Sequence, residues 1–329
     1  MDTQLSIEVK REKRKQGIKR YSLALGFVIP FVIFFVFFTL VPLLMGIGLS
    51  FFKYNPNNPS AMEFVGLNNY KEIFGSSSEA IAVTFVKPFW QSLGKTMLFC
   101  LIIVPLLIII PMFLAYLINY HPPGYKLFRA IIYLPSIVSI TIAGMMFTAI
   151  FGETSTGLLN NLFGTHIQFL TETKWRWIIM IILSIWWQTG TNFVIFSAAL
   201  RDVPKSLYEA CSVDGGGKLK SFIHVTLPNI KGQINLCLFS TLINYLNFYG
   251  QPTVIKSNLI YENEYDSPMM LIQNTLKTLP NWTGFICAIA VIFGIIVMII
   301  SMLERYLISR EKGGLGYEKK FATLSNLKK

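Results

Sequence analysis

Charged side chains are scarce in this 329-residue chain. They make up 14% of its residues, where about 25% is usual for soluble domains. Hydrophobic residues make up 53% of the chain. A soluble core could not absorb that much apolar sequence, so the composition excludes an ordinary soluble domain and predicts a membrane protein.

Histidine and cysteine are also rare. The three histidines are scattered, and the four cysteines show no paired spacing. This pattern argues against a metal site and against a disulfide framework. It favours cysteines that act as small apolar packing residues. No H-E-x-x-H or G-x-S-x-G motif occurs, so neither a zinc peptidase nor a serine hydrolase is indicated.

A nucleotide-binding P-loop is missing as well. The stretch "LGKTM" at 93–97 contains Gly-Lys-Thr, but Phe89 stands where the first glycine of the motif belongs. The stretch "GGGKLK" at 215–220 has Ser212 at that position and Leu219 in place of the Ser or Thr. The chain is therefore predicted to bind no cofactor of its own and not to be an enzyme. Energy for uphill work would come from an ion gradient or from another polypeptide.

Long apolar stretches are what the sequence has in abundance. Six of them approach or exceed the roughly 20 residues that a helix needs to cross the hydrocarbon layer. They are Leu23–Phe52, Leu93–Tyr120, Ile131–Phe151, Trp177–Ala199, Ile234–Ile255 and Phe285–Leu307. We therefore predict an all-α membrane protein with six transmembrane helices.

The distribution of Lys and Arg predicts the orientation. Six spans place both termini on one side, and that side carries 21 of the 29 Lys and Arg residues. By the positive-inside rule this face is cytosolic. Residues 1–21 then form a basic cytoplasmic N-terminus, 22–308 the six-span domain and 309–329 a cytoplasmic tail. Topology accounts for the net charge of +12 without a nucleic-acid partner.

One polar segment, 201–232, interrupts the apolar sequence: "RDVPKSLYEACSVDGGGKLKSFIHVTLPNIKG". Pro204 suits the first turn of a helix, and Asp214 with the glycines after it predicts a sharp break. Pro228 is expected to end a second short helix. The result is a two-helix elbow on the basic side. On these grounds alone it is as readily a simple connection as a docking element.

The elbow resembles the cytoplasmic loop signature of inner-membrane permeases of binding-protein-dependent ABC importers: E-A-A, three residues, G, nine residues, I-x-L-P. The matching residues are Glu209, Ala210, Cys211, Gly215, Val225, Leu227 and Pro228. "GFVIPFVIFFVFFTLVPLLMGIGLSFFKYN" and "FVGLNNYKEIF" are similar to the opening of sugar permeases of the maltose and glycerol-phosphate type, specifically the first of their two unlike subunits. The resemblance covers residues 23–307. Where this subfamily often has a Gly-Gly-Pro turn, the chain reads "KSNLIYENE", which leaves the external gate and the particular substrate open.

This resemblance implies a type I ABC importer permease fold with a cytoplasmic coupling-helix loop, in the bacterial cytoplasmic (inner) membrane. It also implies a second permease subunit, two ABC ATPases that bind ATP and Mg, and an extracellular solute-binding protein. The chain would carry a sugar or oligosaccharide inward. The residues implied to dock on the ATPase are Glu209, Ala210, Cys211, Asp214, Gly215, Leu227 and Pro228.

Neutral sugars are bound by planar amides and aromatic faces, which the spans would have to supply. The candidates are Trp186, Trp187, Gln188 and Asn192 in the fourth span and Asn244, Asn247, Tyr249 and Gln251 in the fifth. Polar side chains at that depth usually face either a cavity or a partner helix. Hydrogen bonding between helices is therefore the competing explanation for each of them.

The last external loop, 256–282, is the only acidic one. Glu262, Glu264 and Asp266 lack the spacing of a calcium loop, so we expect a solvated loop. Two alternatives to a sugar permease stay open. One is a polytopic membrane enzyme, such as a lipid-linked glycosyl or acyl transferase, which predicts a titratable cluster at one interface. The other is an ABC importer permease for a non-sugar solute.

Overall fold

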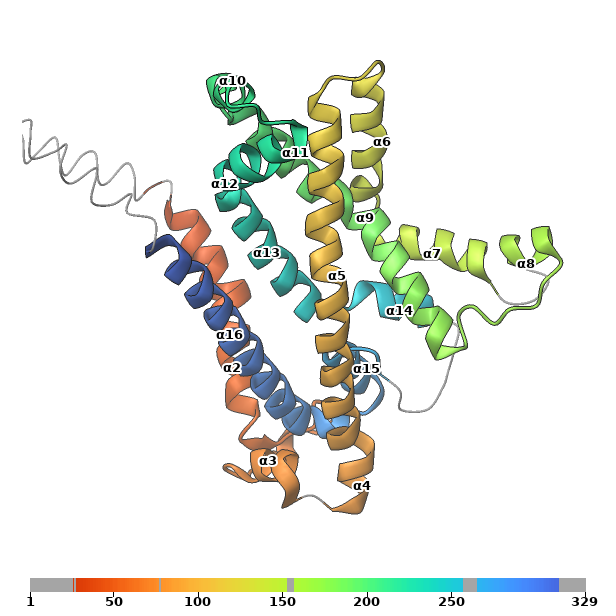
Figure 1. Ribbon diagram of the computed structural model, residues 1–329. Coiled ribbons are helices and arrows are strands. Elements are labelled where there is room, and N and C mark those ends of the chain that lie inside the picture. Colours follow the sequence, from red (N-terminus) through yellow and green to blue (C-terminus); the bar gives the residue numbers. More distant parts are fainter. Residues whose placement is uncertain (1–25, 27, 77, 153–156, 257–264, 314–329) are drawn as a thin grey trace, which may run out of the picture. The chain divides into compact units, whose positions relative to one another are not determined.

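The computed structural model describes residues 26, 28–76, 78–152, 157–256 and 265–313. These residues are mostly helical (Figure 1). They form two compact units, one of residues up to 71 together with 278–291, the other of residues 72–277 together with those from 292 onward. The predicted basic N-terminus, 1–21, and most of the tail, 309–329, lie outside the described residues.

Four helical stretches are long and apolar enough to cross a membrane. They are Val28–Leu49, Glu79–Asn119, Thr173–Asp202 and Pro280–Ile308. These stretches correspond to the first, second, fourth and sixth predicted spans. A fifth crossing is possible if one bent pair of helices counts as a single span.

The third predicted span is that bent pair. Helix α6 (Tyr125–Ile137) and helix α7 (Ile140–Phe151) lie at 99° to each other. Pro135 lies in the last turn of α6, and the Ser139 hydroxyl accepts a hydrogen bond from the Ile142 N–H at the start of α7. Proline disturbs a helix interior and serine favours a helix start. The predicted span Ile131–Phe151 therefore consists of parts of two helices, because apolar content does not report such a break.

The fifth predicted span is also broken. Helix α13 (Lys231–Leu246) ends at Asn247, which has φ −100° and ψ 18°, and α14 (Gly250–Lys256) follows. Among the described residues no single helix over 234–255 is long and apolar enough to cross alone. One continuous fifth helix was therefore a wrong expectation, and the count of six transmembrane helices stays a prediction.

The first unit combines an apolar helix with a small cap. Its elements are η1 (Val36–Leu40), α2 (Val41–Leu49), β1 (Phe52–Lys53), η2 (Pro59–Ala61), β2 (Glu63–Phe64), α3 (Asn68–Lys71), η7 (Pro280–Trp282) and the start of α16 (Thr283–Gly313). The two strands are antiparallel, with Phe52 opposite Phe64. The Asn69 amide donates to Ser50 O at 2.8 Å and so ties α3 to the end of α2.

The second unit holds the helical bundle. Besides α6, α7, α13, α14 and the rest of α16, it contains η3 (Glu72–Ser76), α4 (Glu79–Ile81), η4 (Ala82–Val86), α5 (Lys87–Asn119), α8 (Leu158–Phe163), α9 (Thr173–Asp202), α10 (Lys205–Val213), α11 (Lys218–Ser221), η6 (Phe222–Thr226), α12 (Leu227–Asn229) and α15 (Pro268–Thr278). Helix α5 packs along α9, and α13 packs against α5. The phenyl rings of Phe99 and Phe248 stack at 4.8 Å in one core cluster. Cys237 lies in a second cluster as a buried free thiol.

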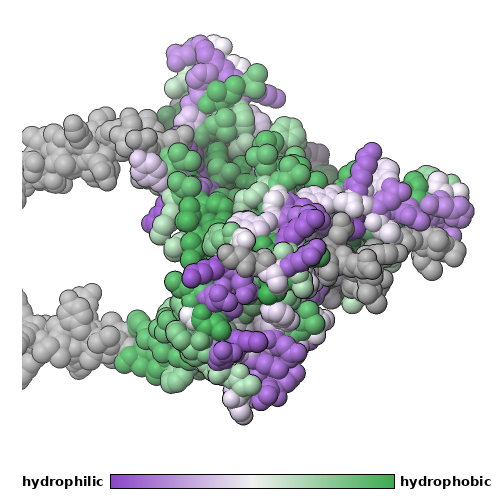
Figure 2. All heavy atoms as spheres, turned by 90° about the horizontal axis from the view of Figure 1, so that it is seen from below, coloured by the Kyte–Doolittle hydropathy of each residue, from purple (hydrophilic) through white to green (hydrophobic). Residues whose placement is uncertain are grey.

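Helix α6 reaches α9 through a glycine. A Cβ added at Gly190 would lie 2.8 Å from Ser136 Oγ and 2.9 Å from the Ile132 carbonyl oxygen. Any larger residue would push the two helices apart. Away from such contacts, wide areas of hydrophobic side chains are exposed (Figure 2). That surface suits helices that meet lipid or other membrane subunits.

Candidate functional site

The predicted elbow is present as a run of short helical segments. Helix α10 begins shortly after the end of α9, and α11, η6 and α12 follow. Gly215 has φ +69°, a backbone conformation that favours glycine, so the break lies where the sequence predicts it. Segments α11, η6 and α12 follow one another without a break in helical backbone, and the run ends at Asn229, one residue after Pro228. The second helix therefore ends within one residue of the predicted position.

One hydrogen bond braces the elbow. The Tyr208 hydroxyl lies 3.1 Å from Thr226 Oγ1 and so joins α10 to η6. Thr226 is fully buried, and Tyr208 packs against the core cluster that includes Ile230. Neither residue was predicted from the sequence to take part in the elbow. They lie 18 positions apart on separate segments, so no helical or strand periodicity relates them.

Most of the motif residues lie on an accessible segment, and Val225 is the buried exception. Glu209, Ala210, Asp214, Gly215 and Pro228 are exposed, whereas Cys211 and Leu227 are half-buried. Two apolar side chains next to the motif, Val213 and Leu219, are 87% and 73% exposed. Exposed apolar groups among polar ones are typical of a protein-docking surface.

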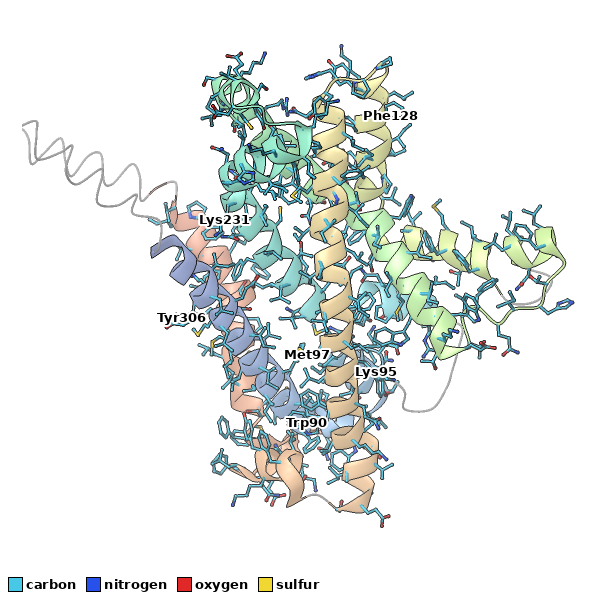
Figure 3. The ribbon with its side chains drawn as sticks, in the orientation of Figure 1. Trp90, Lys95, Met97, Phe128, Lys231 and Tyr306 are labelled. Atoms are coloured by element: carbon cyan, nitrogen blue, oxygen red, sulfur yellow. The ribbon has the colours of Figure 1, made fainter. Side chains whose placement is uncertain are left out.

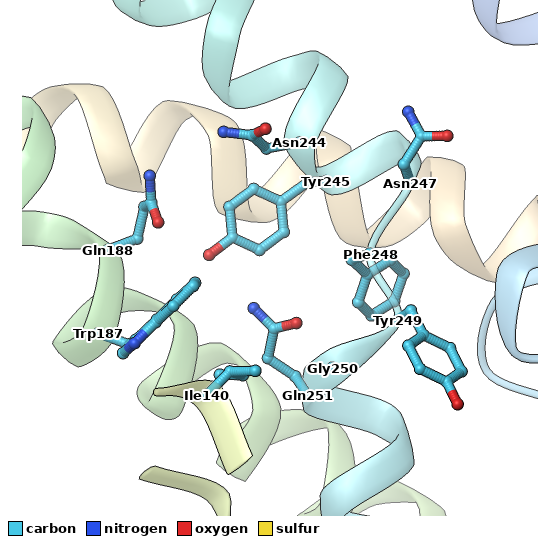
Figure 4. A pocket seen from close by; sticks show the side chains of 10 residues that line it. All are labelled: Ile140, Trp187, Gln188, Asn244, Tyr245, Asn247, Phe248, Tyr249, Gly250 and Gln251. Carbon is cyan, nitrogen blue, oxygen red and sulfur yellow. The ribbon is translucent and has the colours of Figure 1, made fainter. Parts of the chain in front are cut away.

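A pocket of about 330 Å³ lies where α7, α9, α13 and α14 meet (Figure 4). Its lining consists of Ile140, Trp187, Gln188, Asn244, Tyr245, Asn247, Phe248, Tyr249, Gly250 and Gln251. Six of the eight sequence candidates are among them. The break between α13 and α14 brings residues on both sides of it to one cavity. Ile140, Tyr245, Phe248 and Gly250 were not predicted.

None of the described residues that line the pocket carries a formal charge. Gln188 and Gln251 supply amides that both donate and accept hydrogen bonds, and they turn toward the same space as the Tyr245 hydroxyl (Figure 4). Trp187 Nε1 donates to the Val138 carbonyl at 2.8 Å, which fixes the indole at the edge of the pocket. The volume is at the lower end of the ~300–1,000 Å³ range of ligand pockets. This lining suits a small, uncharged molecule that is rich in hydroxyl groups.

Two sequence candidates do not line this pocket. The Asn192 amide is buried and donates to the Leu107 carbonyl at 2.8 Å and to Thr241 Oγ1 at 3.1 Å. It therefore joins α9 to α5 and α13. The Trp186 ring lies 5.7 Å from the Phe147 ring and packs against the core.

The acidic loop differs from expectation at Asp266. Its carboxylate is fully buried, with Oδ2 3.3 Å from Arg176 Nε and Oδ1 3.9 Å from Lys95 Nζ; Figure 3 labels Lys95 on α5. A solvated position was wrong for this residue, because a buried carboxylate needs cations beside it. Burial also raises the pKa of the neighbouring Tyr265 phenol, and an interaction with Thr275 opposes part of the rise. Glu262 and Glu264 lie outside the described residues.

The elbow and the pocket both fall within one matched region. Residues 108–311 match the family described as binding-protein-dependent transport system inner membrane component. The chain belongs to this family. It is a multi-pass inner-membrane permease component of a transport system and not an enzyme, which sets the transferase alternative aside.

Relatives of known name cover most of the chain. It is 30% identical over 300 residues to the arabinooligosaccharides transport system permease protein of Halalkalibacterium halodurans, with 87% of each chain covered. It is 26% identical over 314 residues to the lactose transport system permease protein of Rhizobium radiobacter, with 89% of this chain and 96% of that protein covered.

Solved structures show a similar fold. A chain of the bacterial alginate ABC transporter, in complex with alginate pentasaccharide-bound periplasmic protein, matches with a TM-score of 0.71 at 24% identity. The match covers 90% of this chain and 96% of that one. The fold is therefore that of a membrane chain of a bacterial ABC transporter.

Proposed function

We propose that the chain is a permease subunit of an ABC importer that carries a sugar or oligosaccharide inward. Family membership supports transport, and the named relatives transport arabinooligosaccharides or lactose. The observation that supports a saccharide site is the lining of the pocket, whose described residues offer amides and aromatic rings and carry no formal charge.

The complete importer would contain further subunits. This chain pairs with a second permease, two ATPases that bind ATP and Mg, and an extracellular solute-binding protein. Both termini face the cytosol. The α6–α7 pair and the α13–α14 pair complete the third and fifth of six crossings, within a domain of residues 22–308.

The elbow would transmit motion from the ATPase. Glu209 pairs with a basic group in a cleft of that subunit, and Gly215 supplies the bend. The Tyr208–Thr226 hydrogen bond keeps α10 fixed to η6, so that displacement of α10 moves the helix that continues into α13. A rigid element at an interface with two arrangements is a recognised way to switch a membrane bundle.

In the pocket, Trp187 would offer its ring face to a sugar ring, while Gln188, Asn244 and Gln251 exchange hydrogen bonds with hydroxyl groups. Asn247 and Tyr249 border the same cavity. An acidic saccharide would need a cation to offset the cost of losing water. The uncharged lining therefore favours a neutral saccharide.

Charge reversal in the elbow tests the docking role. Glu209→Arg should leave membrane insertion intact and abolish uptake by the reconstituted importer, because the ATPase no longer engages. Glu172→Arg, an exposed carboxylate at the other end of α9, is the matched control and should retain uptake. Normal uptake with Glu209→Arg would contradict the proposal, as would robust ATP hydrolysis by the purified chain alone.

The pocket is tested by uptake kinetics with lactose, an arabinotriose and an alginate oligosaccharide as probes. Loss of one neutral hydrogen bond should weaken binding roughly 2- to 10-fold. Gln188→Ala should therefore raise the KM for the transported neutral probe, whereas the exposed Gln168→Ala should not. Uptake of only the alginate probe would overturn the neutral assignment. Uptake of a peptide or amino acid and of no saccharide would favour the non-sugar alternative.

A further inference from the structure

A second cavity, of about 290 Å³, lies between α6 and α9 near the elbow end of α9. Its lining consists of Arg129, Ala130, Tyr133, Phe193, Val194, Ser197 and Arg201. It therefore combines two guanidinium groups with an apolar wall. None of these residues belongs to the saccharide pocket or to the elbow motif.

The two arginines lack a counter-charge in the described part of the chain. The ion pairs there join Asp266 to Lys95 and Arg176, and neither involves Arg129 or Arg201. Within the described residues, Arg201 Nε donates only to the Ser197 carbonyl of its own helix, at 3.0 Å. Two like charges that share one cavity repel each other, so an anion between them would stabilise both.

Buried polar atoms mark the same cavity. Arg129 Nε and Ser197 Oγ are buried and have no hydrogen-bond partner among the described residues. The Arg129 guanidinium carbon lies 5.5 Å from the centre of the Tyr125 ring, a cation–π contact that holds the group in place. Buried donors without partners are costly, and an oxygen-rich anion supplies the missing acceptors.

The depth of the cavity selects the kind of anion. Arg201 is the last residue but one of the candidate span Thr173–Asp202, which is longer than the ~20 residues that cross the hydrocarbon. The guanidinium of Arg201 therefore lies at the level of lipid headgroups. Ala130, Tyr133 and Val194 are exposed and offer a surface to an acyl chain.

We propose that this cavity binds the phosphate group of an anionic phospholipid. Arg129 and Arg201 hold the phosphate oxygens, Ser197 donates its hydroxyl, and the acyl chains run along the exposed side chains of α6 and α9. Basic pockets between membrane helices recognise lipid headgroups in this way. The inference concerns lipid and is independent of which solute the chain transports.

The test measures lipid retention by the purified full-length chain. Native mass spectrometry in detergent would compare added palmitoyl-oleoyl phosphatidylglycerol with the phosphatidylcholine of the same chains. We expect the wild-type chain to retain the phosphatidylglycerol preferentially. The double variant Arg129→Gln/Arg201→Gln should lower that affinity about tenfold. Lys126→Gln/Lys205→Gln removes the same charge from exposed positions outside the cavity and should change it little.

Further variants and ligands in the same experiment distinguish an anionic phospholipid from other anions. Arg201→Gln alone alters an exposed side chain, so a retained fold with several-fold weaker phosphatidylglycerol binding supports the site even if the double variant fails to fold. Equal binding by Arg201→Gln and the Lys126→Gln/Lys205→Gln control would overturn it. Binding of inorganic phosphate with no preference for phosphatidylglycerol would assign the cavity to a free anion. Loss of partner subunits from Arg201→Gln with unchanged lipid binding would assign it to a protein carboxylate.

Discussion

The two ends of α9 handle positive charge in opposite ways. Near its start, Arg176 is 3% exposed and lies 3.3 Å from the buried Asp266 carboxylate. Near its end, Arg201 is exposed and donates only to its own helix within the described residues. The charge of Arg176 is therefore neutralised within this chain, whereas Arg201 has no ion-pair partner among the described residues.

The start of α9, with the Arg176–Asp266 ion pair, is therefore a fixed end, and the end of α9 at Arg201 is the working end. A buried ion pair gives a fixed geometry and is expensive to break. An exposed arginine costs little alone and can exchange partners. The end of α9 that leads into the elbow is therefore the one equipped to meet other molecules, while the Asp266 end holds α5, α9 and the segment before α15 together.

Breaking the ion pairs of Asp266 at the fixed end of α9 should have the largest effect on the free energy of unfolding. Asp266→Asn removes the carboxylate beside two cations, and we expect the free energy of unfolding to fall by about 3–5 kcal/mol. Thermal unfolding in detergent, followed by tryptophan fluorescence, measures it. Glu172→Gln neutralises an exposed carboxylate at the same end of α9 and should shift the midpoint little. Equal shifts for the two variants would show that burial of Asp266 carries no energetic weight.

At the working end, Gly215→Asp should matter more for transport than for stability. A side chain at φ +69° costs up to about 1–2 kcal/mol, and Asp is among the residues that tolerate this conformation best, so stability should fall little. The added carboxylate at the bend should disturb docking of the elbow, so uptake should be abolished. Gly217→Asp places the same side chain two residues on, at φ −72° and with nothing within 4 Å of the added Cβ. Uptake by this second variant should persist. Loss of uptake in both would implicate the added charge and not its position at the bend.

The smallest effect is expected from Tyr208→Phe, which removes one neutral hydrogen bond worth about 0.5–1.5 kcal/mol. The elbow should loosen, so ATP hydrolysis by the assembled importer should continue while less solute is carried per ATP. Combining Tyr208→Phe with Thr226→Val tests the contact directly. If the two residues act through their hydrogen bond, the double variant should be less affected than the sum of the single ones. Fully additive losses would argue against it.

Sequence was most informative where a local pattern decides the structure. The glycine break at 215 follows from backbone freedom, and four apolar stretches follow from hydropathy. The elbow motif is contiguous, so its residues could be named together. The Tyr208–Thr226 contact joins separate segments and left no periodic signal.

Sequence was least informative where burial is set by packing between distant elements. The residues next to Asp266 in the sequence do not indicate that it forms a buried ion pair with Arg176, 90 positions earlier. The break between α13 and α14 was missed for a related reason, because Asn247 and Gly250 only dilute an apolar average. That break nevertheless brings together most of the polar groups of the pocket.

The hydrogen bond from the Trp187 indole to Val138 ties the wall of the pocket to the joint between α6 and α7. Both residues are half-buried, so a cargo that tilts this ring would break the hydrogen bond at a cost of about 0.5–1.5 kcal/mol. In the proposed transport cycle, loading of the pocket would therefore be coupled to the angle between α6 and α7. The kink would serve as a sensor of occupancy as well as a bend in the chain.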